Sequence, residues 1–183
     1  MTTIKRIAKE VHDCIANVSS EEVDAAVDLI EGPPRVFVAG AGRSALGIRG
    51  FAMRLMHLGV TSHVVGETTT PGIAAGDVLV IGSGSGSTAS LVAAAEKAHA
   101  IGVSILLVTI DPTSPIGQLA DVTIRVPAPS PKAAGGGSSS SIQPMGSLFE
   151  QSLFLLLDAL IVLLMNKKGI DSEEMFGRHA NLE

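Results

Sequence analysis

Apolar residues recur along this chain with two different spacings. Short, mostly β-branched runs, several of them ending in glycine, predict buried strands at 35–40, 61–66, 77–82, 104–110 and 121–127. Apolar positions three and four residues apart predict helices at 2–18, 20–32, 48–59, 88–102 and 148–165, with Ser20 as the N-cap of the second and one helical turn at 114–120. Strands that alternate with helices indicate an α/β fold, a three-layer sandwich in which a five-stranded parallel sheet is flanked by helices.

The length of 183 residues suits one domain, covering 1–183. Within it we expect N-terminal helices over 1–32 and C-terminal helices over 147–183. The intervening segment 127–146 is rich in proline, glycine and serine, which is typical of a loop. Its composition fits either a lid or a linker.

The composition narrows the class of protein. With 46% hydrophobic and 17% charged residues, the chain is expected to fold, and with no Trp or Tyr its core must be built from aliphatic side chains. The few aromatic residues and the net charge of −5 argue against nucleic-acid binding. The single cysteine, Cys14, excludes an internal disulfide and is expected to be buried or half-buried on a helix.

Two features bear on location in the cell. The N-terminal residues carry charges throughout and do not resemble a secretory signal, so we expect a cytoplasmic protein. The segment 148–165 approaches membrane-span length, but Glu150 and Asp158 interrupt it. We therefore expect a buried helix there and no membrane association.

A Gly/Ser-rich run, IGSGSGSTAS, joins the strand at 77–82 to the next helix. Glycines let a ligand approach the backbone, and hydroxyls and helix N-terminal amides donate hydrogen bonds, so this arrangement favours an anion, most often phosphate. A second glycine-rich turn, 41–47, follows the strand at 35–40. Both turns fall at strand carboxyl ends, where parallel sheets bind ligands. A flexible linker is the alternative for the Gly/Ser run.

Several kinds of chemistry lack their usual motifs. The glycine spacing does not match a dinucleotide fingerprint or a nucleotide triphosphate loop, so no cofactor is expected. No metal site is expected either, because the histidines lack ligand spacing: His12, His57, His63, His99 and His179. GSGSG resembles a nucleophile elbow, but its hydroxyl and glycine neighbours suit phosphate binding better.

Two titratable residues remain as candidates for chemistry. Glu150 is expected in the first turn of the long apolar helix, where it either serves as an acid–base group or only complements the helix dipole. His179, near the end of the chain, is either a functional group or an ordinary solvated side chain.

Five segments together resemble a known family: VAGAGRSALGIRGFAMRLMHLGV, VVGETTTP, IGSGSGST, MGSLFEQ and RHANLE. They are similar to the 6-phospho-3-hexuloisomerases, small sugar-isomerase (SIS) domain proteins of the ribulose monophosphate pathway, which assimilates formaldehyde. The resemblance covers nearly the whole chain. It implies a SIS-domain fold, a phosphorylated hexulose as substrate, and a homotetramer.

The resemblance also implies roles for individual residues. Glu150 matches the glutamate that carries the proton, and His179 matches a histidine supplied by a neighbouring subunit. The phosphate would be held by residues of the two glycine-rich turns: Gly42, Arg43, Ser44, Ser83, Gly84, Ser85, Gly86, Ser87 and Thr88. Many relatives have Glu where this chain has Ser87, so Ser87 receives no catalytic role.

The implied reaction interconverts D-arabino-hex-3-ulose 6-phosphate and D-fructose 6-phosphate through an enediol. One carboxylate can remove the proton and return it to the adjacent carbon without a redox cofactor. Two alternatives stay open. One is another aldose–ketose isomerase, such as an arabinose 5-phosphate isomerase, and the other is a non-catalytic phosphosugar-sensing module.

Overall fold

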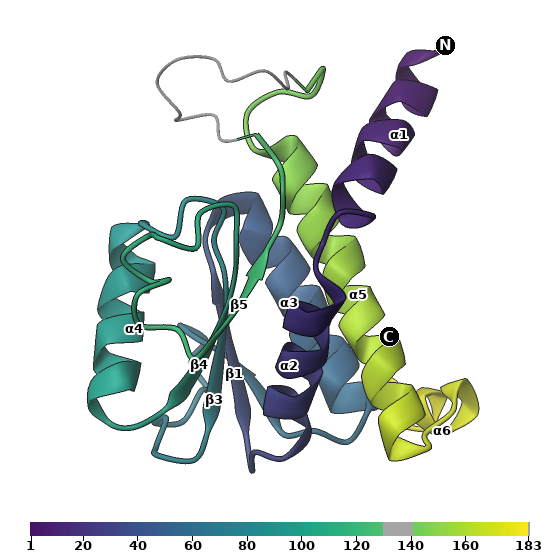
Figure 1. Ribbon diagram of the computed structural model, residues 1–183. Helices are drawn as coiled ribbons and strands as arrows, with labels where there is room; N and C mark the ends of the chain where they lie inside the picture. Colours follow the sequence, from purple (N-terminus) through teal and green to yellow (C-terminus); the bar gives the residue numbers. More distant parts are fainter. Residues whose placement is uncertain (130–140, 183) are drawn as a thin grey trace.

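The computed structural model describes residues 1–129 and 141–182 (Figure 1). Its helices are α1 (Thr3–Ile15), α2 (Ser20–Glu31), α3 (Gly42–His57), α4 (Ala89–Ala100), α5 (Ser147–Lys168) and α6 (Ser172–Phe176). Its strands are β1 (Val36–Gly40), β2 (Ser62–Val64), β3 (Val78–Gly82), β4 (Ser104–Thr109) and β5 (Val122–Arg125). All five expected strands are present.

The strands form one parallel sheet in the order β2-β1-β3-β4-β5. The chain runs from β1 outward to β2 and then returns to place β3 on the other side of β1. The order therefore reverses between β1 and β3, and such a switch point is where open α/β sheets bind ligands. The last residues of these two strands, Gly40 and Gly82, are paired in register.

The two faces of the sheet are buried in different layers. Alternate residues of β1 divide between them, because successive side chains of a strand point to opposite faces. Val36 and Val38 pack with α1, α2, α3 and α5, whereas Phe37 and Ala39 face α4. Figure 1 shows α4 alone on one side and α2, α3 and α5 on the other. The core is mainly aliphatic as expected, but it also contains Phe37, Phe51 and Phe149.

Helix α5 is long and apolar enough to cross a membrane by length and composition alone. Core helices of globular proteins pass the same test, and 44% of its most apolar window is buried inside this fold. The expectation of a buried helix is correct for one face only. On the other face Phe154, Leu155 and Val162 are 46%, 49% and 54% exposed.

Three details differ from the expected elements. The N-cap of α2 is Ser19, whose hydroxyl accepts a hydrogen bond from the Glu22 amide at 3.3 Å, and not Ser20. The segment 41–47 is mostly the first turns of α3 and not a loop. The segment 114–120 contains one helix-like hydrogen bond, from the Gln118 amide to Ser114 O at 3.0 Å, but it is otherwise made of turns, and its Ile116 amide donates to Gly86 O. Most of the expected loop at 127–146 lies outside the described residues.

An ion pair joins the other end of the sheet, away from the switch-point loops. Asp77, which is 2% exposed, accepts hydrogen bonds from Arg35 Nη2 at 2.6 Å and Nε at 3.0 Å, and from the Ala74 amide at 2.8 Å. Burial by itself raises the pKa of the Asp77 carboxyl, but the hydrogen bonds from Arg35 and Ala74, together with the nearby positive charge, outweigh it and hold this pKa below its ordinary value. Arg35 and Asp77 immediately precede β1 and β3, so the pair ties the starts of these two strands together.

Candidate active site

Three helices begin without a side-chain cap, and they begin at the same end of the sheet (Figure 1). The N-cap residues of α3, α4 and α5 are Ala41, Thr88 and Gly146, and none makes a side-chain cap hydrogen bond. By contrast, α1, α2 and α6 are capped by Thr2, Ser19 and Asp171. First-turn amides have no partner within their own helix, and the helix dipole favours negative charge there. The three uncapped starts therefore form a surface suited to an anion.

The Ser83–Thr88 loop is held from below by the end of β4 and the turn that follows it. Gly84 O accepts hydrogen bonds from the Ile110 amide at 3.1 Å and from Thr109 Oγ1 at 3.2 Å. Gly86 O accepts one from the Ile116 amide at 3.1 Å. With its carbonyls occupied in this way, the loop has a fixed shape and is not a flexible linker.

Gly86 occupies a position that only glycine fits. Its φ of +55° is in the left-handed region, and a Cβ there would overlap the Ser114 hydroxyl. Gly84 lies against the first turn of α5, since a Cβ on it would be 3.1 Å from Phe149 Cδ1. The loop is thus packed beside the residue that precedes Glu150.

The predicted phosphate-binding hydroxyls differ in exposure. Ser44 and Ser83 are buried at 9% and 4% exposure, Ser85 and Thr88 are half-buried, and Ser87 is exposed. Ser85 Oγ accepts a hydrogen bond from the Ser87 amide at 3.3 Å. The structure places all of them in the first turn of α3 or in the loop leading to α4.

Glu150 lies in the first turn of α5, as expected, and faces Arg43 from the first turn of α3. Arg43 Nη1 is 3.1 Å from Glu150 Oε2 and donates a hydrogen bond to Ser147 Oγ at 3.0 Å. The Glu150 side chain is 20% exposed and that of Arg43 is 58% exposed. Oε2 itself is buried and accepts no hydrogen bond from the described residues. Arg43 is close enough to form an ion pair with it, but its N–H groups do not point at this oxygen. A carboxylate with a free lone pair, next to an anion-binding surface, is able to accept a proton from a bound ligand.

His179 is not brought to Glu150 within one chain. Its ring stacks on His57 with centroids 5.3 Å apart and on Phe176 at 5.8 Å. His179 also lines a surface cavity with Ile161, which lies 11 residues, or about 16 Å, along α5 from Glu150. Burial, with smaller contributions from Arg54 and His179, lowers the pKa of His57. A role for His179 in the same site would need a second copy of the chain.

Some residues that shape this site were not expected from the sequence. Thr109 supports the Gly84 carbonyl, Ser114 packs under Gly86, and Ser147 accepts the Arg43 hydrogen bond. Of these residues, only Thr109 is marked in the sequence, as a polar residue that follows the apolar run of β4. Within residues 1–129 and 141–182, no three His, Cys, Asp or Glu side chains are grouped as metal ligands.

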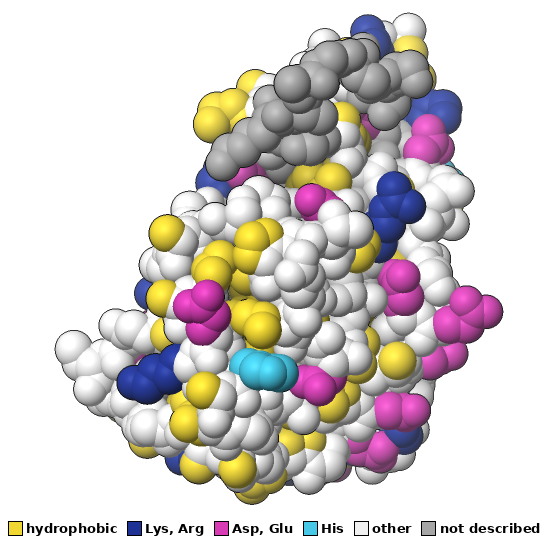
Figure 2. All heavy atoms as spheres, turned by 60° about the vertical axis from the view of Figure 1, so that its left-hand side comes forward, with side chains coloured by type: hydrophobic (Ala, Val, Ile, Leu, Met, Phe, Trp, Pro, Cys, Tyr) yellow, Lys and Arg dark blue, Asp and Glu magenta, His cyan; other side chains and the backbone are white. Residues whose placement is uncertain are grey.

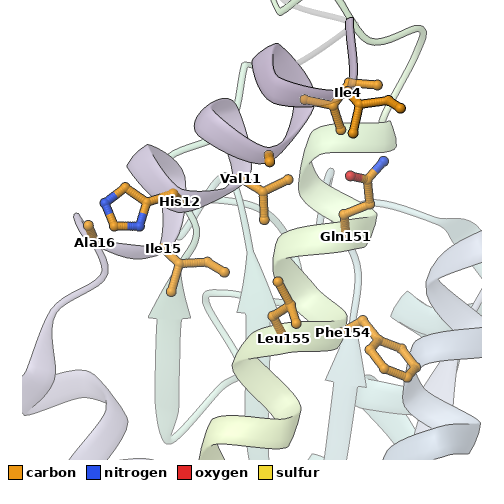
Figure 3. A pocket seen from close by; sticks show the side chains of 10 residues that line it. Ile4, Val11, His12, Ile15, Ala16, Gln151, Phe154 and Leu155 are labelled. Atoms are coloured by element: carbon orange, nitrogen blue, oxygen red, sulfur yellow. The ribbon is translucent and has the colours of Figure 1, made fainter. Parts of the chain in front are cut away.

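The surface of the molecule is mixed in character in one region and apolar in another. On the face shown in Figure 2, charged side chains of both signs are interspersed with apolar ones. Between α1 and α5, by contrast, lies an apolar groove of about 860 Å³ (Figure 3). Its lining includes Ile4, Val11 and Ile15 from α1 and Phe154 and Leu155 from α5. We call this the α1/α5 groove.

Comparison with known proteins relates this chain to one family. The SIS domain family matches residues 29–155. A 3-hexulose-6-phosphate isomerase of Bacillus subtilis is 52% identical over 180 residues, covering 98% of this chain and 97% of the relative. One of Mycobacterium gastri is 47% identical, covering 97% of this chain and 88% of the relative. A solved structure from Methanococcus jannaschii, for which a molecular function of 3-hexulose-6-phosphate isomerase was inferred, has a TM-score of 0.85 and 32% identity, covering 98% of each chain. The chain therefore belongs to the SIS-domain family and, within it, to the 3-hexulose-6-phosphate isomerases.

Proposed function

We propose that the protein interconverts D-arabino-hex-3-ulose 6-phosphate and D-fructose 6-phosphate. The observation that carries this proposal is the position of the Glu150 carboxylate, which shares one end of the sheet with the uncapped starts of α3, α4 and α5. The anion-binding surface accounts for the phosphate, and the carboxylate accounts for the proton transfer. The relatives from Bacillus subtilis and Mycobacterium gastri, which carry the name of this activity, support the same assignment.

The phosphate is held at the switch point between β1 and β3. Its ligands are the amides and side chains of the two glycine-rich segments: Gly42, Arg43, Ser44, Ser83, Gly84, Ser85, Gly86, Ser87 and Thr88. The fixed shape of the Ser83–Thr88 loop supports this role, because a rigid set of donors loses little conformational entropy when it binds an anion. Ser87, which is exposed, is assigned to the phosphate site only and has no catalytic role.

Glu150 moves the proton. The two sugars differ in the position of the carbonyl, at C3 in the hexulose and at C2 in fructose 6-phosphate. Removing the proton from C2 of the first or from C3 of the second gives the same enediol, so one carboxylate on one side of the sugar serves both directions. Arg43, 3.1 Å from Glu150, is a cation beside the proposed base and would stabilise the negative charge that develops on the enediol oxygens. The phosphate site positions the substrate for this step.

The reaction is tested by incubating the protein with fructose 6-phosphate in deuterated water and locating the label by NMR. The proposal predicts deuterium at C3, together with the signals of the 3-keto sugar. Deuterium at C1 would instead indicate an aldose–ketose isomerase. Saturable binding of fructose 6-phosphate with no exchange would indicate a phosphosugar sensor, and either result would contradict the proposal.

We also propose that the active form is a homotetramer and that His179 acts in the site of a neighbouring copy. The α1/α5 groove and the exposed apolar side of α5 support assembly, since apolar surfaces of this extent are typical of interfaces. His179 would assist ring opening of fructose 6-phosphate. The 3-keto sugar needs no ring opening, because the hydroxyl that would close its five-membered ring carries the phosphate.

Sedimentation velocity at micromolar concentration tests this assembly. Ile4 is 79% exposed, so Ile4→Glu should leave each chain folded while lowering the assembled fraction. His179→Ala should slow turnover from the fructose side more than from the 3-keto side. An active monomer, or equal slowing in both directions, would contradict these two proposals.

Two further proposals concern the domain organisation of the chain and its place in the cell. We propose that the chain is one domain, because a single apolar cluster includes residues from α1, α2, α3, α5 and α6 and from the sheet. We propose a cytoplasmic enzyme of the ribulose monophosphate pathway, on the basis of the activity named for its relatives.

A further inference from the structure

Glu10, on α1, holds the segment that leads into α5. Its Oε2 accepts hydrogen bonds from Ser141 Oγ at 2.6 Å and from Gln143 Nε2 at 3.2 Å, and its Oε1 accepts one from the Ile142 amide at 3.0 Å. Three consecutive residues, more than 130 positions away in the sequence, are thus fixed by one carboxylate. The hydrogen bond from Ser141, followed by that from Ile142, lowers the pKa of Glu10, so the group is ionised at neutral pH.

The contacts continue from this segment to the surroundings of Glu150. Gln143, which is 8% exposed, accepts a hydrogen bond from Gln151 Nε2 at 2.6 Å. Gly146 O accepts the Glu150 amide hydrogen bond at 3.0 Å. Gly146 also lies against the carboxylate, since a Cβ on it would be 3.3 Å from Glu150 Oε1. A shift of the segment 141–146 would therefore shift the groups that surround the Glu150 carboxylate.

The contacts of Glu10 are not needed to dock α1, because apolar residues already do this. Val11 and Cys14 already anchor α1 in the apolar core, at 7% and 6% exposure. Asp13, the other acidic residue of α1, pairs with Lys9 of the same helix. Figure 3 shows Gln151 on α5 below α1, on the wall of the α1/α5 groove. Of the two acidic residues of α1, Glu10 is therefore the one that is connected by hydrogen bonds to the start of α5.

We propose that Glu10 is a positioning residue for the reaction. It holds residues 141–143 directly, Gln143 is joined in turn to Gln151 on α5, and the Glu150 carboxylate is thereby kept in the orientation that proton transfer needs. This inference rests on the proposed function, because it assumes that Glu150 carries the proton. It assigns to α1, which lies outside the residues matched by the SIS family, a part in catalysis.

The test compares Glu10→Gln with Asp13→Asn as a matched control on the same helix. The amide nitrogen that Glu10→Gln introduces cannot accept a hydrogen bond, so at least one donor of the 141–143 segment is released. Because small misplacements of reacting groups cost large factors in rate, kcat should fall about tenfold or more, while KM changes less than about twofold. Asp13→Asn should leave both values unchanged. A wild-type kcat in Glu10→Gln would overturn the proposal.

The single cysteine separates positioning from loss of structure. Burial raises the pKa of the Cys14 thiol, so a thiol reagent should react slowly with it as long as α1 stays docked. We expect Cys14 in Glu10→Gln to remain as protected as in the wild type. Rapid labelling would mean that α1 has come away, and this result would overturn the proposal in favour of a structural role.

A double-mutant cycle tests the route through Gln151. If Glu10 acts through Gln143 and Gln151, Gln151→Leu should lower kcat to a similar degree, and the double variant should be no slower than the slower single variant. If the loss of kcat in the double variant equals the product of the two single losses, the residues act independently, and this would contradict a shared route. Failure of the proposed function would be seen separately, as a wild-type protein and an Asp13→Asn control that both lack turnover.

Discussion

Replacing Gly86 with alanine tests whether the shape of the Ser83–Thr88 loop controls substrate binding. A residue with a Cβ at φ +55° is strained by about 1–2 kcal/mol. The new Cβ would also overlap Ser114, which is 4% exposed, and such overpacking costs about 1–3 kcal/mol. We expect the loop to relieve this by moving. Since about 1.4 kcal/mol is a factor of ten in affinity, KM for fructose 6-phosphate should rise at least about tenfold.

Gly169→Ala is the matched control. Gly169, at the end of α5, has a φ of +66° with no atom within 4 Å of the position of a Cβ, so this variant carries the backbone strain without the overlap. It should lower Tm by about 2–8 °C and leave KM unchanged. Adding Ser114→Gly to Gly86→Ala should recover part of the lost affinity, because it removes the overlapping atoms. If Gly86→Ala has a normal KM, or if Gly169→Ala raises KM equally, the shape of the Ser83–Thr88 loop does not control phosphate binding.

Two further predictions concern the ion pairs. At 3.1 Å and an effective dielectric constant of 20, the attraction between Arg43 and Glu150 is about 5 kcal/mol, but solvent around the exposed Arg43 should reduce the useful part to about 1–2 kcal/mol. In steady-state kinetics, Arg43→Met should therefore lower kcat/KM about tenfold or more, and Arg43→Lys should recover much of this loss. An unchanged kcat/KM in Arg43→Met would show that Arg43 has no part in the reaction. Asp77→Asn should destabilise the protein by about 2–4 kcal/mol at pH 7 without changing KM. The folded-state pKa of Asp77 lies below its ordinary 3.8, so the wild type loses this stabilisation only as the pH falls below that value. Urea unfolding should therefore show the two proteins becoming equally stable in strong acid. A constant difference in stability at all pH values would contradict the role of the Asp77 charge.

The strands were predictable because both faces of a parallel sheet are covered, which leaves continuous apolar runs in the sequence. The start of α3 was not, since Gly42 and its neighbours have a composition typical of a loop, and only packing in the fold makes them helical. The sequence does not distinguish Ser19 from Ser20 as the N-cap of α2, because the two serines are chemically equivalent as caps.

The site was predictable only in part. Glu150 and the Gly/Ser loop lie next to local patterns that point to them, namely a helix start and a strand–turn–helix order. The contacts between Arg43 and Ser147 and between Glu10 and Ser141 join residues 104 and 131 positions apart. No local pattern encodes such pairs, because they exist only once the helices are packed. The distance of His179 from Glu150 within one chain is a consequence of the length of α5 and could not be inferred from the tail sequence.

Solvent exchange at C3 of fructose 6-phosphate in Glu150→Gln shows whether Glu150 carries the proton. Glutamine keeps the shape of the side chain but cannot take up the proton, and general base catalysis contributes about a hundredfold to ten-thousandfold in rate. The variant should therefore bind fructose 6-phosphate with a similar KM and unfold at a similar temperature, while deuterium incorporation at C3 and kcat both fall at least about a hundredfold. Exchange at C3 at the wild-type rate would show that another group removes the proton and would contradict the role assigned to Glu150.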